Sequence, residues 1–242
     1  LYKQAENYLL ESKQSKNFLS DVYVGMALIY FYSGDISRAE VYAEKAMEKG
    51  LKSYGEFNPN MTFVYMSYAN VLESQGRIEE AIALLEKSLQ IRKSTYGDFH
   101  RWTCEAHYDL ASAYSLIKDY DKAEALFKKA IEIGRQIESS SYLANAKNYL
   151  AKLYLDQEIN LEEAKNLLLE GLDKNISIYG PKNEVVSENY RFLAQLFEIK
   201  REENPFFQYL NKSLLSANYK ADSIQQVIAP IQALQSLMLL GE

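Results

Sequence analysis

The residues of this chain that could bind a metal ion are its two histidines and its single cysteine. His100, Cys104 and His107 are spaced four and three residues apart, so on a helix they would share one face. Imidazole and thiolate donors at such a spacing can hold zinc. His100, however, lies near the start of that segment, next to a loop. We therefore expect these residues to serve packing, and we predict no metal site and no cofactor.

Catalytic motifs are missing from the sequence. It contains no Gly-x-Gly-x-x-Gly, Gly-Lys-Ser/Thr, His-Glu-x-x-His or Gly-x-Ser-x-Gly string, so phosphate-binding loops, zinc proteases and serine hydrolases have no support. The carboxylate pairs Glu79-Glu80 and Glu162-Glu163 stand at the start of predicted helices, where they favour the positive end of the helix dipole. We therefore predict that this chain is not an enzyme.

Charge and hydropathy exclude two classes of partner. The 242 residues carry a formal net charge of -6, with a pI near 5.2, and no basic cluster, which argues against nucleic acid and anionic membranes. The longest nearly apolar run, residues 22–32, is too short to span a bilayer. A single cysteine allows no internal disulfide, which is compatible with a reducing compartment. Because the chain begins at Leu1 rather than at methionine, we interpret it as a trimmed domain or a processed chain.

The elements that position these residues are expected to be helices in a repeating array. Intervals of 42, 42 and 41 residues separate Ala39, Ala81, Ala123 and Ala164, and a further copy stands at Ala5. A period of this length is typical of solenoid proteins. Only 10 glycines and 4 prolines occur in the whole chain, which favours helices joined by short turns. The predicted fold class is therefore all-α.

Each period splits into two apolar stretches with helical spacing, separated by a short turn such as residues 33–35. The second helix of a pair is predicted to end at Tyr54-Gly55, Tyr96-Gly97 or Tyr179-Gly180, where glycine can adopt a left-handed conformation. Asn204 before Pro205 indicates the start of another second helix, over about 205–220. The expected domains are an array over 1–222 and a capping or extension helix over 223–242. Within the array we expect a partial repeat at 1–16 and repeats at about 18–54, 60–96, 101–138, 141–179 and 183–220.

Small and large residues occupy fixed offsets in each predicted pair, and this pattern resembles the tetratricopeptide repeat (TPR). A large-small pair with an aromatic or leucine residue three positions on recurs at Met26-Ala27, Tyr68-Ala69, Leu110-Ala111, Leu150-Ala151 and Leu193-Ala194. The 42-residue period and the joints at 54–59 and 96–100 resemble the subclass found in kinesin light chains. The resemblance implies a right-handed α-α superhelix of antiparallel pairs, and it places His107 at a large packing position. Ser88, Gly171 and Phe206 depart from the pattern, since alanine is usual at their positions.

In this family the first helices of the pairs line a concave, peptide-binding groove. Groove residues lie two positions before and two after the large residue of each pair. The resemblance thus assigns to the groove Val24, Leu28, Met66, Asn70, Tyr108, Ser112, Asn148, Lys152, Arg191 and Gln195.

These side chains indicate the kind of ligand. Amides such as Asn70, Asn148 and Gln195 can bind a peptide backbone, while Met66 and Tyr108 offer anchor sites for apolar side chains. A groove that clamps a terminal carboxylate would need several cations, and only Lys152 and Arg191 resemble that arrangement. We expect a non-enzymatic, cytoplasmic scaffold or adaptor that binds a peptide segment of a partner protein.

Two other roles stay open. The chain could be a structural subunit of a large ciliary or mitochondrial assembly, or a regulatory domain of a larger enzyme. The predicted last helix carries the apolar run 237–240, which implies either burial against further chain or self-association.

Overall fold

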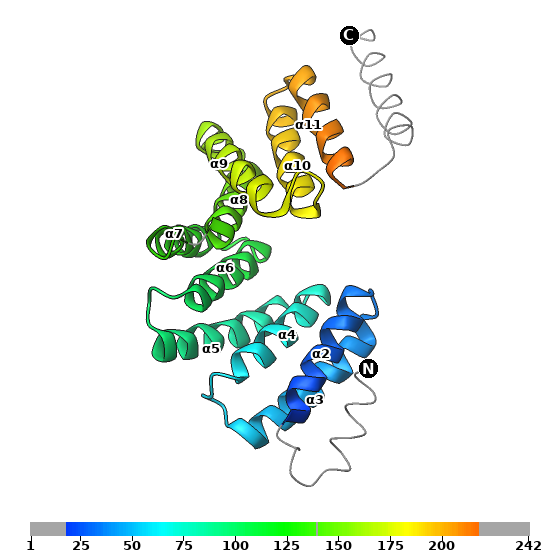
Figure 1. Cartoon of the computed structure of the whole chain (residues 1–242), viewed down its shortest axis with the longest axis vertical. Coiled ribbons are helices and arrows are strands. Elements are labelled where there is room, and N and C mark those ends of the chain that lie inside the picture. The colour runs from blue at the N-terminus through cyan, green and yellow to red at the C-terminus, as the bar shows by residue number, and fades with distance from the viewer. Residues whose placement is uncertain (1–17, 139, 218–242) are drawn as a thin grey trace. The chain divides into compact units, whose positions relative to one another are not determined.

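The computed structural model describes residues 18–138 and 140–217, and within them every regular element is a helix (Figure 1). The helices are α2 (Leu19–Tyr32), α3 (Ile36–Tyr54), α4 (Met61–Ser74), α5 (Ile78–Tyr96), α6 (Arg101–Leu116), α7 (Tyr120–Gln136), α8 (Ser140–Asp156), α9 (Leu161–Tyr179), α10 (Glu184–Ile199) and α11 (Glu203–Ser216). This confirms the all-α prediction. The partial repeat at 1–16 and the last helix at 223–242 lie outside the described residues.

The chain divides into two compact units at Ile133 and Gly134, inside α7, and each unit is a run of helix hairpins. In the first unit α2 packs on α3 and α4 packs on α5, while α6 meets α7 through the Cys104 thiol, which donates to the Ala130 carbonyl at 3.2 Å. In the second unit α8 packs on α9 and α10 packs on α11. Successive helices therefore form the predicted pairs.

The alanine ladder explains how the helices approach one another. Ala39, Ala81, Ala123 and Ala164 are all fully buried, and so is the small residue of the first-helix pairs at Ala27, Ala69, Ala111 and Ala151. A methyl side chain at a helix crossing lets two backbones come close without leaving a void. The repeated alanine is thus the contact point of each pair.

The turn inside each hairpin uses one recurring backbone conformation. Gly34 and Gly76 have φ of 80° and 76°, and Lys118, Glu158 and Arg201 take φ of 61°, 55° and 57° at the turns that follow. L-residues other than glycine pay roughly 1–2 kcal/mol in this region. The same positive φ therefore occurs in repeats that have lysine, glutamate or arginine at the position of the glycine.

The glycines that follow the second helices differ in one respect from the prediction. Gly55, Gly97 and Gly180 do have positive φ, between 78° and 84°, but their ψ is 162° to 174°. This is an extended conformation open to glycine rather than the left-handed helical one. It turns the chain sharply out of α3, α5 and α9 and into the next pair.

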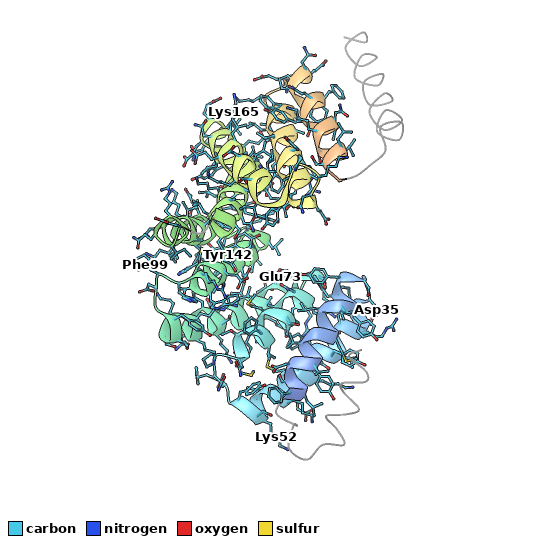
Figure 2. All side chains as sticks on the ribbon, in the orientation of Figure 1. Asp35, Lys52, Glu73, Phe99, Tyr142 and Lys165 are labelled. Carbon is cyan, nitrogen blue, oxygen red and sulfur yellow. The ribbon has the colours of Figure 1, made fainter. Side chains whose placement is uncertain are left out.

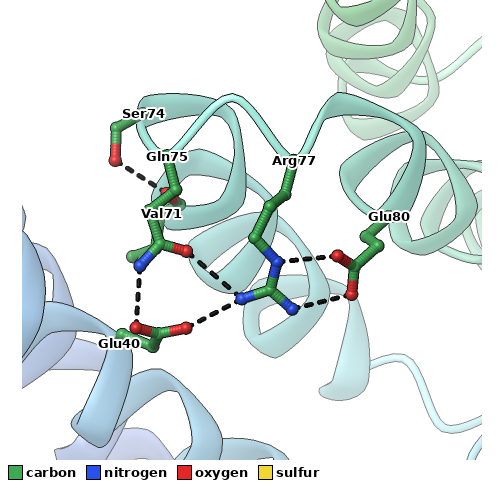
Figure 3. Close-up of polar contacts among 6 residues, drawn as sticks. All are labelled: Glu40, Val71, Ser74, Gln75, Arg77 and Glu80. Carbon is green, nitrogen blue, oxygen red and sulfur yellow. Dashed lines mark hydrogen bonds and ion pairs between the residues drawn. The ribbon is translucent and has the colours of Figure 1, made fainter.

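Polar side chains tie the first pair to the second at the α4–α5 turn (Figure 3). The Arg77 guanidinium donates to both carboxylate oxygens of Glu80, at 2.6 and 2.7 Å, and to Glu40 of α3 at 2.8 Å. The Gln75 amide donates to the other oxygen of Glu40 at 2.7 Å. Bidentate geometry of this kind fixes orientation more than it adds stability at an exposed position.

One predicted helix start was wrong. Asn204 does not cap the last described helix, because α11 begins at Glu203 and places Pro205 within its first turn. The missing amide hydrogen of proline is harmless in a first turn, where amides have no intrahelical acceptor.

Among the described residues, none of the helices combines the length and the apolar composition that crossing a bilayer would require.

Candidate functional site

The predicted groove residues all lie on the first helices of the pairs. Val24 and Leu28 lie on α2, Met66 and Asn70 on α4, and Tyr108 and Ser112 on α6 of the first unit; the other four lie on α8 and α10 of the second. Eight of the ten are half-buried, whereas Asn148 is buried and Arg191 is exposed. Half-burial is suited to side chains that are positioned by the fold and still reach a ligand.

Helix α4 carries an open part of this surface. Phe63, Met66, Asn70 and Glu73 follow one another at spacings of three and four residues, so they lie on one face of α4. Within the described residues the half-buried Asn70 amide has no hydrogen-bond partner, and Phe63 is largely exposed. The α4 face thus offers apolar area together with free donors and acceptors.

A buried arginine on α5 contacts both this face of α4 and the neighbouring helix α6. Arg92 of α5 is only 1% exposed, and its Nη1 donates at 2.8 Å both to the Trp102 carbonyl and to the Glu105 carboxylate. Its Nη2 contacts the sulfur of Met66, and its guanidinium lies 5.5 Å from the centre of the Trp102 ring. Because a buried cation is costly unless it is paired, these contacts hold α4, α5 and α6 in one arrangement.

The sequence analysis did not single out Arg92, although a signal was present. It continues the inward-facing positions Ala81, Leu85 and Ser88 at spacings of four and three residues, so a charged residue stands where the pattern requires a buried one. A cation on the apolar side of an amphipathic helix predicts a buried anion nearby. Glu105 is that anion.

Two further carboxyl groups lie at this site without an ion-pair partner among residues 18–138 and 140–217. One is Glu73, which is labelled in Figure 2, and burial raises its pKa to about 7. Burial also raises the pKa of Asp109 to about 8; the nearby carboxylates of Glu105 and Glu73 act in the same direction, while Arg92 opposes them. The Asp109 Oδ2 atom is buried and has no hydrogen-bond partner. Neither residue was predicted to be part of the site.

The α6 residues that were predicted contribute less than expected. The Tyr108 ring packs against Phe127 of α7, with 6.1 Å between the ring centres, so part of its surface belongs to the α6–α7 contact. The Ser112 hydroxyl is buried and has no hydrogen-bond partner. The face of α6 that meets α4 carries Trp102, whose ring contacts Phe63 edge-on with 5.7 Å between centres.

In the second unit, the assignment of Asn148 to the groove surface was wrong. Asn148 is 4% exposed, and its Nδ2 donates to Asn189 of α10 at 2.7 Å. Asn175 of α9 donates to the same oxygen at 3.1 Å, and Asn189 donates to the Leu168 carbonyl at 3.0 Å. Three amides therefore link α8, α9 and α10 from the inside. Gly171 leaves the space that this cluster occupies, because a Cβ there would stand 2.0 Å from the Asn148 Oδ1.

The basic end expected for the groove is neutralised. Lys152 pairs with Asp156 one turn further along α8, and Arg191 pairs with Glu188 at 3.0 Å. Gln195, which is half-buried, has no hydrogen-bond partner within the described part of the chain. A clamp for a terminal carboxylate is therefore not favoured, whereas Gln195 keeps its capacity to bind a peptide backbone.

The histidine and cysteine residues have separate structural roles. His100 accepts a hydrogen bond from the Trp102 amide at 3.2 Å as the N-cap of α6, and it stacks on Tyr96. His107 is 7% exposed, and burial lowers its pKa to about 4, with Lys93 and Lys129 adding to the effect. In the described ranges no three His, Cys, Asp or Glu side chains are disposed to hold a metal ion.

A pocket of about 630 Å³ lies apart from the predicted groove residues. It is formed mainly by α5 and the residues after it, with a contribution from α6, and it is lined by Glu86, Leu89, Gln90, Lys93, Ser94, Gly97, Asp98 and Leu110. Three of these residues are charged. Lys93 and Asp98 form an ion pair at 3.1 Å, and the Glu86 carboxylate accepts a hydrogen bond from the Tyr114 hydroxyl at 2.8 Å. The pocket has no convergent set of free polar groups that would identify a ligand.

Comparison with known proteins supports the repeat assignment. The tetratricopeptide repeat family model matches residues 61–136, which are α4 to α7. The sequence matches none of the curated proteins with which it was compared.

Solved structures show the same fold at low sequence identity. BtubC (BKLC) from P. vanneervenii is 14% identical, with a TM-score of 0.68 over 94% of this chain and 88% of that one. A Podosopora anserina protein of nearly identical TPR-like repeats, named as a kinesin light chain, is 18% identical, with a TM-score of 0.65 over 84% of this chain and 96% of that one. Aspartyl phosphate phosphatase F from Bacillus subtilis is 16% identical, with a TM-score of 0.69 over 98% of this chain and 62% of that one. The resemblance to TPR proteins, including kinesin light chain-like ones, is confirmed.

Proposed function

Because its helix pairs have the tetratricopeptide-repeat fold, we propose that this chain binds a peptide segment of a partner protein on the faces of its first helices. Proteins of this fold are in general scaffolds for protein interaction. We also propose that the chain is not itself an enzyme and that it acts in the cytoplasm.

The observation that carries the proposal is the unused hydrogen-bonding capacity on α4. Asn70 is half-buried and held on a helix, and in the described residues nothing accepts from or donates to its amide. Apolar groups on the same face, Met66 and Phe63, can take side chains of an extended peptide while Asn70 binds its backbone. Val24 and Leu28 on α2, and Gln195 on α10, are the corresponding groups on other first helices.

Affinity capture with groove variants tests the proposal. We expect Met66→Glu combined with Asn70→Ala to lose the partners that the wild-type chain captures, as compared by mass spectrometry. Glu79→Gln changes an exposed carboxylate on α5 and is the matched control. An unchanged set of captured proteins with the α4 variant would contradict the proposal.

One observation favours the structural-subunit role as a second candidate. Phe57 and Phe99 stand at equivalent positions in the loops after α3 and α5, and they are 66% and 50% exposed. Exposed aromatic rings at loop tips are typical of contact sites between proteins. Under this alternative, Phe57→Ser with Phe99→Ser would abolish assembly, while the α4 variant would leave it intact.

A further inference from the structure

We propose that the face of α4 and α6 around Glu73 and Asp109 binds a cationic side chain, lysine or arginine, of the partner peptide. The inference rests on the proposed peptide-binding function and names the chemistry of its ligand. It concerns residues of the first unit alone.

The geometry places anionic groups beside apolar ones on two neighbouring helices. Glu73 follows Asn70 and Met66 on the face of α4, and Asp109 lies one turn beyond Glu105 on α6. Arg92 joins the two helices, since it touches Met66 on α4 and is paired with Glu105 on α6. The Phe63–Trp102 contact lies at the start of the same two helices.

The charges at this site do not balance. Arg92 is the cation of the cluster, and its ion pair is with Glu105. Glu73 and Asp109 have no ion pair within residues 18–138 and 140–217, so ionisation of both leaves an excess of two negative charges. An anion that is removed from water and left unpaired is strongly unfavourable, which makes the cluster a site that a cation stabilises.

Asp109 provides an observation independent of the charge count. Its Oδ2 atom is buried and accepts no hydrogen bond, although Glu105, Arg92 and Glu73 are all close enough to influence its ionisation. A buried oxygen without a donor is uncommon in a folded protein. An ammonium or guanidinium group carries several N–H donors and would satisfy it.

The arrangement fits an organic cation better than a metal ion. Glu73 and Glu105 both act electrostatically on Asp109, but among the described residues these three carboxyls do not form a group that could hold a metal ion. Separate carboxyl groups on two helices match the spread donors of lysine or arginine. Met66 and Phe63, nearer the start of the same face of α4, offer apolar surface to the residues that flank the cation in the peptide.

Binding is expected to depend on pH. The charged groups facing Asp109 are Glu105 on its own helix, Arg92 from α5 and Glu73 from α4. With the pKa of Glu73 near 7 and that of Asp109 near 8, both carboxyls are partly protonated at neutral pH. A cation must displace these protons, so its affinity should rise between about pH 6 and pH 8.

The test uses two matched peptides and the single tryptophan of the chain, Trp102, as the reporter. The probes are acetyl-Gly-Leu-Lys-Leu-Gly-amide and the same peptide with norleucine in place of lysine. Each is titrated into the whole chain, and binding is followed by Trp102 fluorescence and by calorimetry in two buffers of different ionisation enthalpy. We expect the lysine peptide to bind about tenfold tighter or more at pH 7.5, with release of protons.

Variants locate the effect. Glu73→Gln with Asp109→Asn should abolish the preference for the lysine peptide over the norleucine peptide, while Glu79→Gln should leave that preference intact. Both substitutions replace half-buried carboxyls with neutral groups of the same shape, so the fold should persist, and thermal unfolding checks this. If the double variant does not fold, Glu73→Gln alone decides the outcome.

Equal affinities for the two peptides in the wild-type chain, or a lysine preference that survives the double variant, would overturn the inference while leaving the peptide-binding function standing. If neither peptide binds, this inference is overturned as well. The separate capture experiment with the Met66 and Asn70 variant then decides whether the proposed function also fails.

Discussion

Replacing Gly171 with alanine tests how closely the amide cluster of the second unit is packed. Gly171 lies inside α9, where alanine is ordinarily better than glycine by about 1 kcal/mol. Here, however, an added Cβ would stand 2.0 Å from the Asn148 Oδ1 and 2.9 Å from its Cγ. We therefore expect Gly171→Ala to destabilise the protein, against the usual trend for a helix.

The magnitude follows from what Asn148 must give up. To make room, its amide has to leave the 2.7 Å hydrogen bond to Asn189, which costs roughly 1–3 kcal/mol for buried polar groups. Crowding of the packed helices adds about 1–3 kcal/mol, and the better helix propensity of alanine returns about 1 kcal/mol. The free energy of unfolding should therefore fall by about 1–5 kcal/mol.

A double-mutant cycle combines Gly171→Ala with a second substitution, Asn148→Ala. It removes the clashing atoms, and the next neighbour of the new Cβ would be the Ala144 carbonyl at 3.3 Å. In that background Gly171→Ala should stabilise the protein by about 1 kcal/mol, as in an ordinary helix. The coupling between the two positions is then roughly 2–6 kcal/mol.

Urea unfolding of the four proteins, followed by circular dichroism, measures the cycle, and amide hydrogen exchange in α8 to α10 shows whether the change is local. Trp102 lies in the first unit, so its fluorescence reports on that unit and should shift less than the circular dichroism signal does. If Gly171→Ala alone proves as stable as the wild type or more so, Asn148 can rotate away freely, and the account of a tightly packed amide cluster is wrong.

Three further results are expected from substitutions in the first unit. Lys118 has φ of 61°, so Lys118→Gly should raise the free energy of unfolding by about 1 kcal/mol and Lys118→Ala should not; urea unfolding distinguishes the two. The pKa of Asp109 is raised to about 8 from an ordinary value of 3.8, so between these pH values the folded state binds a proton that the unfolded state has released. Stability should therefore fall as pH rises from about 4 to 8. Thermal unfolding across this range should show a weaker decline for Asp109→Asn, whereas Asp121→Asn, at an exposed position, should behave like the wild type. The pKa of His107 is lowered to about 4, so its contribution to the free energy of unfolding is complete above pH 6.5 and is lost as pH falls towards 4. His107→Leu should reduce this loss of stability at acid pH. An unchanged pH dependence below 6.5 would contradict the prediction.

The sequence predicted the helix pairs well because their cause is local. Ala39, Ala81 and Ala123 recur at one interval, and each marks a crossing that only a small residue permits. The glycines at 55, 97 and 180 end the second helices for an equally local reason, which is their access to positive φ.

The groove could not be predicted to the same degree, because it depends on contacts between residues far apart in the chain. Asn148 satisfies the family spacing, yet it is buried because Gly171 leaves space and Asn189 accepts its hydrogen bond, and no local pattern shows either fact. Gly171 departs from the alanine that is usual at its position, and the absence of a Cβ there makes room for the Asn148 amide. Similarly, the role of Glu105 is to pair with the buried Arg92, which lies 13 residues earlier on another helix.

The division of the chain inside α7 has a consequence for how the molecule can be taken apart. Residues up to Ile133 belong to one unit and those from Gly134 to the other, so the boundary falls inside the continuous helix α7. Phe127, Ala130 and Ile133 are buried on one side of the junction, and on the other a Cβ at Gly134 would stand 3.1 Å from the backbone of Leu143. A protein cut at the junction would leave each half with an incomplete helix. In a one-dimensional array such a helix transmits cooperativity, so fraying of α7 should loosen its neighbours in both directions.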